Sequence, residues 1–230
     1  MIREKFDLTG RTALVTGSTR GIGLAIGDAF EEYGAKVIRH NTKVCDLADP
    51  AAIDRWFPTL PPVDILVCNA SIQERMKWWE FSMDEARKEA QVNYLATLRL
   101  FQLAYPHMKA QKWGRLIAVG SVQEQRPHPD MIGYSATKGA QENLVRSIAR
   151  QVAAEGITAN NLCPGVFFTD RNKEALGNPV YAKKVTDAIP MHDYAVPEDA
   201  AGAALLLASD AGRYITGATI RIDGGLSLPG

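Results

Sequence analysis

A glycine-rich turn near the N-terminus, between a strand-like run and a helical run, limits the fold of this chain most strongly. Residues 12–16 form an apolar, strand-like run, and a helical pattern spans residues 24–33. Gly17, Gly21 and Gly23 lie between them, and this spacing allows a tight turn and a close backbone approach. The N–H groups at the start of such a helix can bind a pyrophosphate. By itself, a glycine trio also fits an ordinary strand–helix turn, so its meaning depends on the rest of the chain.

Strand-like apolar runs alternate with helical runs along the whole chain. Such alternation is typical of a parallel sheet covered by helices on both faces. The 230 residues suit one compact domain with a sizeable core. The sequence therefore predicts an α/β fold: a single dinucleotide-binding Rossmann domain over residues 1–230, with a doubly wound parallel sheet of six to seven strands. The expected strands are 12–16, 35–39, 64–68, 116–120, 157–163 and 219–225, and the expected helices are 24–33, 50–56, 82–109, 134–154 and 197–209.

One connection in this pattern is too short for a complete fold of this type. The second expected strand ends near His40, and the tripeptide Cys45-Asp46-Leu47 follows almost at once. Parallel neighbours need a crossover of about a dozen or more residues, which is usually helical. We therefore expect the crossover helix between strands two and three to be missing. Residues 41–46 should run along the top of the sheet without forming a full third strand.

The charge balance and the cysteine content exclude several classes of protein. The chain has 26 basic and 26 acidic residues, a balance that favours neither nucleic acid nor an anionic membrane as a partner. The N-terminus lacks the apolar core of a signal peptide, and no apolar run is long enough to span a bilayer. The three cysteines are scattered, and the four histidines lack metal-ligand spacing. We expect a cytoplasmic protein with reduced cysteines, no metal site and a small-molecule substrate.

Three polar residues in the second half of the chain form a candidate proton-transfer site. Ser121 lies at the exit of the apolar run 116–120. Tyr134 and Lys138 are four residues apart at the start of an expected helix, so they share one helix face. A hydroxyl, a phenol and an ammonium that converge on one point can exchange protons with a substrate.

This arrangement resembles the catalytic Ser…Tyr-x-x-x-Lys of the short-chain dehydrogenase/reductase family. The glycine pattern at 17–23, Asn93 within Gln91-Val-Asn93, and Pro-Gly-x-x-x-Thr at 164–169 also match motifs of that family. The pattern covers nearly the whole chain. The resemblance implies an NAD(P)-dependent oxidoreductase that transfers hydride between a nicotinamide and a small secondary alcohol or ketone. The catalytic residues that it implies are Asn93, Ser121, Tyr134 and Lys138.

Lys138 and Tyr134 are expected to act as a pair. A free phenol titrates near ~10, which is too high for an efficient base at neutral pH. An adjacent ammonium favours the phenolate, so we expect Lys138 to lower the pKa of Tyr134, the general acid/base. The resemblance further implies that Lys138 hydrogen-bonds the cofactor ribose and that Ser121 holds the substrate oxygen. It also implies that Asn93 supports a water-mediated proton relay to Lys138.

The cofactor is expected to be NADP, with NAD as the alternative. Family members that use NAD usually end the second strand with an acidic residue, and Asn41 stands at the matching position. The guanidinium of Arg20, just before the second glycine, suits a 2′-phosphate. Ser71 replaces the glycine of the family's usual Asn-Ala-Gly. The cofactor-binding residues that the resemblance implies are Gly17, Thr19, Arg20, Gly21, Ile22, Gly23, Arg39, Asn41, Asp46, Leu47, Asn69, Ala70, Tyr134, Lys138, Pro164, Gly165, Val166 and Thr169.

The substrate is the least constrained part of the interpretation. Residues 166–196 lack a clean period and are expected to form a substrate lid. The loops look most like the sugar-acid and polyol branch of the family, such as gluconate 5-dehydrogenase, and the implied substrate residues are Gln73, Ser121, Gln123, Arg171 and Asn172. The alternatives are a 3-oxoacyl-carrier-protein reductase and, in another class, a non-catalytic cofactor-binding redox sensor or scaffold. Family members commonly form tetramers through the two long helices and the C-terminal strand, so a homotetramer is expected.

Overall fold

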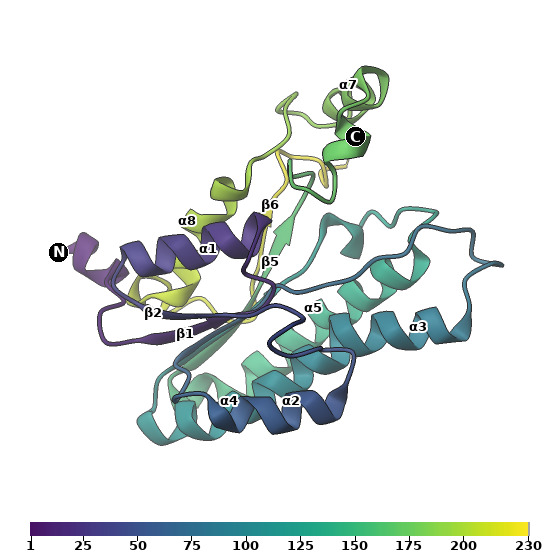
Figure 1. The fold of residues 1–230 in the computed structure, drawn as a ribbon. Helices are drawn as coiled ribbons and strands as arrows, with labels where there is room; N and C mark the ends of the chain where they lie inside the picture. Colours follow the sequence, from purple (N-terminus) through teal and green to yellow (C-terminus); the bar gives the residue numbers. More distant parts are fainter. Residues whose placement is uncertain (230) are drawn as a thin grey trace.

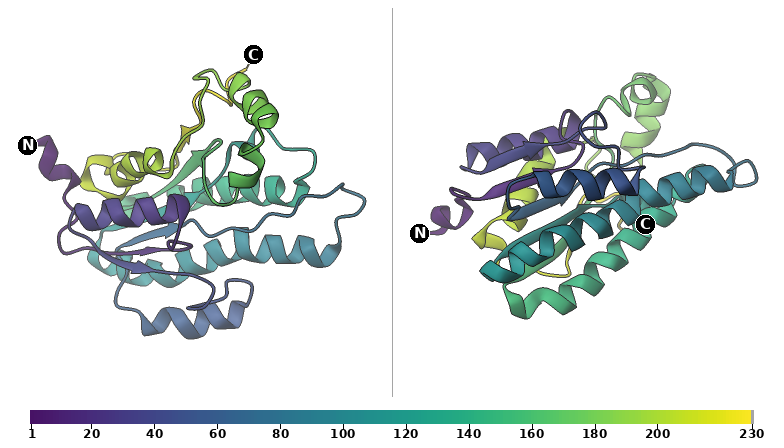
Figure 2. Two further views of the ribbon diagram at one scale, coloured as in Figure 1. Left: turned by 45° about the horizontal axis from the view of Figure 1, so that its top comes forward. Right: turned by 60° about the horizontal axis from the view of Figure 1, so that its bottom comes forward.

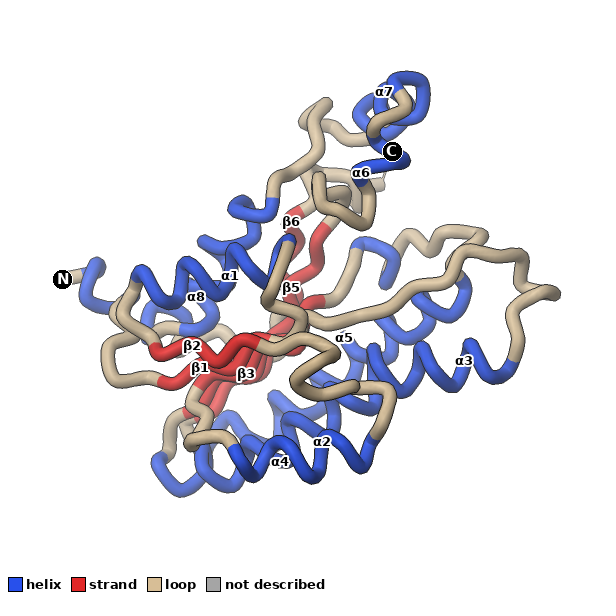
Figure 3. Tube along the Cα trace, viewed as in Figure 1, coloured by secondary structure: helices blue, strands red, loops and turns tan. Residues whose placement is uncertain are grey.

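The computed structural model describes residues 1–229, and these fold into three layers with a twisted parallel sheet in the middle (Figure 1). Six strands, all parallel, lie in the order β2-β1-β3-β4-β5-β6 (Figure 3). The order reverses between β1 and β3, which are hydrogen-bonded neighbours. This is the switch point at which doubly wound folds bind ligands. The strands are β1 (Thr12–Val15), β2 (Lys36–Arg39), β3 (Ile65–Cys68), β4 (Gly114–Val119), β5 (Ile157–Pro164) and β6 (Thr219–Ile222).

Helices cover both faces of the sheet, as the alternating pattern predicted (Figure 2). On one face, α1 (Gly21–Glu32) and α8 (Ala201–Ala208) pack over a core that includes Val15 and Phe30. On the other face, α2 (Pro50–Trp56), α4 (Ala96–Gln111) and α5 (Ile132–Val152) enclose a second core. The sheet residues alternate between the two cores, Leu14 belonging to one and Val15 to the other. The predicted fold class is confirmed.

The region between β2 and α2 has the shortened form that the sequence predicted. Residues 40–49 form turns and loop, and within residues 1–229 no strand lies outside β2. The sheet therefore ends at β2, with the crossover helix and the strand that it would have reached both missing. The buried imidazole of His40 connects the two sides of this short loop. Its Nδ1 accepts the Gly17 N–H at 3.2 Å and its Nε2 donates to the Cys45 carbonyl at 2.9 Å.

The long helix expected over residues 82–109 is present but has a wide turn in its middle. It begins with the predicted capping box, in which Ser82 Oγ accepts the Glu85 N–H and the Glu85 carboxylate accepts the Ser82 N–H. Its first part is α3 (Met83–Ala90), and a π-helical turn at Gln91–Leu95 leads into α4. Such turns occur often at functional sites. The sequence gives no clear signal for this turn, whose centre is Asn93.

The remaining boundaries differ from the expectations by a few residues. α5 begins at Ile132, and a 3₁₀ turn at Pro197–Ala200 precedes α8. The expected lid contains two short helices, α6 (Lys173–Leu176) and α7 (Pro179–Asp187), which project above the sheet beside the C-terminal segment (Figure 1). The three cysteines are buried and free. No helix within residues 1–229 combines the length and apolar character needed to cross a membrane.

Candidate active site

A cavity of about 1210 Å³ opens at the carboxyl ends of the strands. The glycine turn after β1 and Asn69 after β3 line one end, so the cavity includes the switch point of the sheet. Ser121, Tyr134 and the segment after β5 line the other end, and α6 and α7 contribute its outer wall. Single small-molecule sites have volumes of roughly 300–1,000 Å³, so this cavity is large enough for a dinucleotide beside a second reactant.

The glycine turn is shaped to let a ligand approach the backbone. Gly17 and Gly21 have φ angles of 62° and 55°, in the left-handed region that favours glycine. At Gly23 an added Cβ would overlap Asn69 Nδ2 and would lie 2.5 Å from the Gly17 carbonyl oxygen. Asn69 in turn donates to the carbonyls of Thr16 and Gly17 at 2.9 and 3.1 Å. The turn therefore presents the N-terminus of α1 to the cavity, which fits the pyrophosphate of a dinucleotide.

The adenosine end of the cavity lacks some of the residues that the sequence predicted for it, and Arg39 is the clearest case. Arg39 does not reach the cavity, because its Nη2 bridges Asp28 and Glu31 of α1 at 2.7 Å each. Arg20 and Lys43 line this end instead, and Asn41 lies beside them. The prediction of Arg39 as a cofactor residue is corrected on this ground: two carboxylates already neutralise its guanidinium.

Tyr134 is buried at the end of the cavity opposite the glycine turn, with 7% of its surface exposed. Its phenol lies among the hydroxyls of Ser121 and Ser71, which favour the ionised form. Burial nevertheless raises the pKa of Tyr134 above its usual value, and the largest opposing effect comes from the Arg171 guanidinium. The sequence predicted that Lys138, helped by the positive charge of the oxidised nicotinamide, lowers this pKa; in the chain itself, burial outweighs every group that lowers it. Its Nζ lies 5.7 Å from the centroid of the Tyr134 ring.

Lys138 is 1% exposed and anchored from below the cavity. Its Nζ donates to the Val119 carbonyl at 2.6 Å and to Gln141 Oε1 at 3.0 Å. Burial lowers the pKa of Lys138 to about 8, and Glu124 acts in the opposite direction. The ammonium is therefore held at the end of β4 beside Ser121, where it can serve both the phenol and a ribose.

Asn93 lies behind the cavity in the π-helical turn and is fully buried. Its Oδ1 accepts the Ile72 N–H at 2.9 Å. Its Nδ2 donates to the Ile72 carbonyl at 2.9 Å and to Thr137 Oγ1 at 3.1 Å. Asn93 thus joins the segment after β3 to α5, and its contact on α5, Thr137, directly precedes Lys138. Its side chain positions the residues that line the cavity.

Most residues that the sequence predicted for the site line one cavity, but five do not. Among the described residues, Gly23, Arg39, Asp46, Leu47 and Asn93 lie outside its lining. Asp46 caps a turn by accepting the Ala48 N–H at 3.0 Å, and Leu47 is buried in the core. The predicted residues that do line it are Gly17, Thr19, Arg20, Gly21, Ile22, Asn41, Asn69, Ala70, Gln73, Ser121, Gln123, Tyr134, Lys138, Pro164, Gly165, Val166, Thr169, Arg171 and Asn172.

Several residues around Tyr134, Lys138 and Ser121 were not predicted from the sequence. Ser71 was noted only as a departure from glycine, yet its hydroxyl lies beside Tyr134 and accepts Arg171 Nη1 at 3.2 Å. Gln141 supports Lys138 and lies three residues after it on α5, a spacing visible in the sequence. Glu124 accepts the Ser121 N–H at 3.0 Å. The pattern Ser121-x-x-Glu124 is a capping box that the sequence shows.

The substrate end of the cavity is rich in cations. Arg75, Arg126 and Arg171 line it together with His128, whose pKa is lowered by burial, and Asp170 is the acidic residue among the described lining residues. Arg171 also donates to the Ser71 carbonyl at 2.8 Å. The side chains of two other predicted substrate residues are partly engaged: Gln123 Oε1 accepts Ser135 Oγ at 2.7 Å, and Asn172 Nδ2 donates to the Phe167 carbonyl at 3.0 Å.

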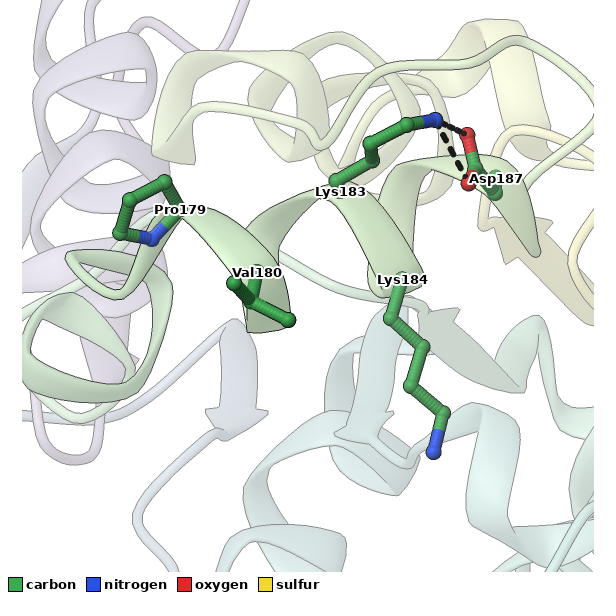
Figure 4. Close-up of a pocket in the computed structure, with 5 residues that line it drawn as sticks. All are labelled: Pro179, Val180, Lys183, Lys184 and Asp187. Carbon is green, nitrogen blue, oxygen red and sulfur yellow. Dashed lines mark hydrogen bonds and ion pairs between the residues drawn. The ribbon is translucent and has the colours of Figure 1, made fainter.

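A second hollow lies on the face of α7 that points away from the large cavity; the residues that line it are drawn in Figure 4. It is lined by Pro179, Val180, Lys183, Lys184 and Asp187, all exposed. Lys183 and Asp187 form an ion pair at 2.8 Å there. Tyr181 and Val185 point to the other side of α7 and line the large cavity. The hollow therefore lies on the outer surface of α7, away from the large cavity.

A dinucleotide cradle and a buried proton-transfer group open into the same cavity. This combination, at the switch point of a doubly wound sheet, defines a class of protein: the NAD(P)-dependent oxidoreductases of the Rossmann type.

Comparisons with known proteins identify the family within this class. Residues 38–227 match the family model described as enoyl-(acyl carrier protein) reductase, so the chain belongs to the short-chain dehydrogenase/reductase family. The 3-oxoacyl-[acyl-carrier-protein] reductase FabG of Rickettsia felis is 31% identical and covers 96% of this chain and 99% of its own length. The gluconate 5-dehydrogenase of Gluconobacter oxydans is 30% identical, with 98% of each chain covered.

The structure is also similar to solved structures of enzymes with related names. One is a gluconate 5-dehydrogenase from Burkholderia cenocepacia in complex with NADP and tartrate. It superimposes with a TM-score of 0.90 at 32% sequence identity, and the match covers 98% of each chain. The chain is therefore an oxidoreductase of this family, an NAD(P)-dependent dehydrogenase.

Proposed function

We propose that this protein is an NADP-dependent oxidoreductase that interconverts a secondary alcohol and a ketone on a small sugar acid. The observation that carries the proposal is the position of the Tyr134 phenol. It is buried in a cavity shared with the glycine turn, between the hydroxyls of Ser121 and Ser71. A phenol placed in this way can give a proton to a carbonyl oxygen or take one from an alcohol.

Each residue of the site has a proposed part in this proton transfer. The nicotinamide, when bound, supplies or accepts the hydride. Ser121 holds the substrate oxygen beside Tyr134, since its Oγ accepts the Gln123 N–H and keeps its own proton free for donation. Lys138 supplies the positive charge that favours the phenolate and also hydrogen-bonds the ribose. Asn93 fixes the Ile72 backbone and Thr137, and through them the spacing between the walls of the cavity.

The charge of the substrate end supports an acid rather than a neutral polyol. Three guanidinium groups, of Arg75, Arg126 and Arg171, line this end against one carboxylate, that of Asp170. Guanidinium groups bind carboxylates through paired, charge-assisted hydrogen bonds. Two of the relatives are named gluconate 5-dehydrogenase, and the solved one contains tartrate, a hydroxy acid. We expect Gln73, Gln123 and Asn172 to contact the hydroxyl groups of such a substrate.

The adenosine end supports NADP over NAD. Arg20 and Lys43 line it, and the acidic residue that would bind a ribose diol and repel a 2′-phosphate is replaced by Asn41. The solved relative contains NADP. Because the shortened loop brings Lys43 to the cavity, we expect it to act together with Arg20 on the 2′-phosphate.

A lid and a tetramer complete the proposal. Residues 166–196 would close over the substrate, and α6 and α7 already contribute to the cavity wall. The homotetramer would use the outer surfaces of α4 and α5, where Leu95, just before α4, is 43% exposed. Light scattering of the purified protein measures the assembly directly, and a monomer would contradict this part.

A second candidate is a 3-oxoacyl-carrier-protein reductase. The relative from Rickettsia felis carries that name and is as similar in sequence as the gluconate enzymes. The guanidinium groups at the substrate end of the cavity could also bind an acidic surface of a carrier protein. Such an enzyme would prefer a carrier-bound thioester to a free sugar acid.

Turnover with a panel of substrates tests the proposal. The panel contains gluconate and its keto forms, neutral polyols, free β-ketoesters and a carrier-bound β-ketoacyl thioester, each with NADP and NAD. We expect the highest kcat/KM with a sugar acid and NADP, and a loss of about 10³-fold or more in Tyr134→Phe, which keeps the ring but cannot transfer a proton. A preference for the carrier-bound thioester would support the second candidate. Cofactor binding without turnover in any reaction would contradict both.

A further inference from the structure

Glu124 anchors the loop that carries Ser121 through its carboxylate. Its Oε1 accepts the Ser121 N–H at 3.0 Å. Asn161 of β5 holds the carboxylate from the other side, since its Nδ2 donates to Oε1 at 3.1 Å and to Oε2 at 3.0 Å. Asn161 is fully buried in the sheet. Glu124 therefore ties the Ser121 loop to β5, a neighbouring strand.

Glu124 and Lys138 hold the same short stretch from two sides. Lys138 donates to the Val119 carbonyl at 2.6 Å, and Glu124 accepts the Ser121 N–H two residues later. Gly120 lies between these contacts, and a Cβ there would overlap the Glu124 carboxylate. The end of β4 is thus fixed between an ammonium and a carboxylate, so the position of the Ser121 hydroxyl depends on both.

The same carboxylate is the main negative charge that acts on the buried ammonium. Among the groups that influence Lys138, Glu124 stabilises the charged form most, while Arg171 opposes it. Glu124 itself faces Lys138 and Glu142 of α5 and the Cys163 thiol of β5. Burial raises the pKa of Glu124 to about 7. Its charge also raises the pKa of Tyr134, against the effect of Arg171.

We propose that Glu124 is a positioning residue of the reaction, which fixes the Ser121 hydroxyl through Asn161 and supplies the negative charge opposite Lys138. This inference rests on the proposed function, because it assigns a part in that proton transfer. It predicts two separable effects. Loss of the anchor misplaces Ser121 and lowers kcat, and loss of the charge makes Tyr134 ionise at lower pH.

The test compares Glu124→Gln, which removes the charge, with Glu124→Asp, which keeps the charge and shortens the reach. The control is Asp64→Asn. Asp64 is also a buried carboxylate that accepts a backbone N–H, that of Thr12 at 2.8 Å, but it lies at the opposite ends of the strands. The ionisation of Tyr134 is measured by ultraviolet difference titration of the NADP complex, with Tyr134→Phe as the blank. This measurement needs no substrate.

In Glu124→Gln we expect a fall in kcat of about tenfold with little change in KM, and a Tyr134 midpoint lower by about half a pH unit or more. Glu124→Asp should lower kcat with a wild-type midpoint, and Asp64→Asn should change neither. A lowered kcat with an unchanged midpoint in Glu124→Gln would overturn the inference, as would wild-type kcat in both variants. If Glu124→Gln does not fold, kcat of Glu124→Asp is compared with kcat of Asp64→Asn. A lower kcat in Glu124→Asp alone supports the inference, and equal values overturn it. If the wild type turns over none of the panel, the proposed substrate is wrong. The midpoint of the Tyr134 titration, which needs no substrate, still tests the effect of the Glu124 charge.

Discussion

Replacement of Lys138 by methionine should abolish activity and yet stabilise the folded protein at neutral pH. The pKa of the buried ammonium falls from 10.5 to about 8. Each pKa unit corresponds to about 1.4 kcal/mol, so keeping the ammonium instead of the neutral amine in the fold costs about 3 kcal/mol. Methionine has a similar length but carries no charge. Lys138, which we propose is catalytic, is thus held in place at the expense of stability, a common trade-off at active sites.

Part of this gain is offset by lost hydrogen bonds. Lys138 donates to the Val119 carbonyl and to Gln141 Oε1, and a buried acceptor left without a partner costs about 1 kcal/mol or more. Two such acceptors reduce the expected gain in the free energy of unfolding to about 1 kcal/mol near pH 7. The variant should therefore unfold at a slightly higher urea concentration than the wild type.

The dependence on pH gives the sharper test. The folded-state pKa of Lys138 lies below the unfolded value, so the unfolded chain binds more protons between about pH 8 and about pH 10.5, and wild-type stability rises with pH in this window. By about pH 9.5 this contribution should reach about 2 kcal/mol. The methionine variant lacks it, so the difference in stability between the two proteins should shrink and then change sign.

Urea denaturation at about pH 7 and about pH 9.5, without nucleotide, measures this difference. Other groups that titrate in this range are common to both proteins and cancel. The control is Lys109→Met. Tyr105 and Glu155 raise the pKa of that exposed lysine, so Lys109→Met keeps the rise in stability that Lys138 causes, and its stability relative to wild type should not fall between the two pH values. A stability difference between wild type and Lys138→Met that stays constant with pH would refute the idea that burial depresses the pKa of Lys138.

Three further predictions concern the cavity and the core. Gly23→Ala should lose NADP binding by more than tenfold in a fluorescence titration, because its Cβ would meet Asn69 and the turn would have to open. Arg171→Met should shift the Tyr134 midpoint upward by less than about one unit, since the guanidinium is exposed and screened, and Ser71→Gly should shift it in the same direction. The three cysteine thiols, buried and with raised pKa values, should react with a thiol reagent only as fast as the protein unfolds.

Much of the fold and the residues that line the candidate site could be predicted because their signals are local. The glycine turn, the strand before Ser121 and the spacing of Tyr134 and Lys138 each depend on a few neighbouring residues. Even the missing crossover followed from the length of one connection. These features survive in the structure within a few residues of the expected positions.

The remaining features depend on contacts between distant parts of the chain. Arg171 binds Ser71 across 100 positions of sequence, and Arg39 is neutralised by two carboxylates of the helix that packs beside it. The direction of the Tyr134 pKa could not be predicted either. It depends on how deeply the phenol is buried, and the amount of burial is a property of the packed chain.

The sheet is shortened at one edge, beyond β2, and this loss does not disturb the region around Ser121, Tyr134 and Lys138. Of the proposed catalytic residues, Ser121 follows β4, Tyr134 and Lys138 belong to α5, and Asn93 lies in the turn before α4, so all come from elements after β3 in the chain. The missing elements would have extended the opposite edge, beyond β2. Because His40 ties the short loop back to the glycine turn, the loss leaves that turn in place. Nucleotide affinity should therefore be sensitive to His40, Arg20 and Lys43, while the pH dependence of turnover should remain a property of the region around Tyr134.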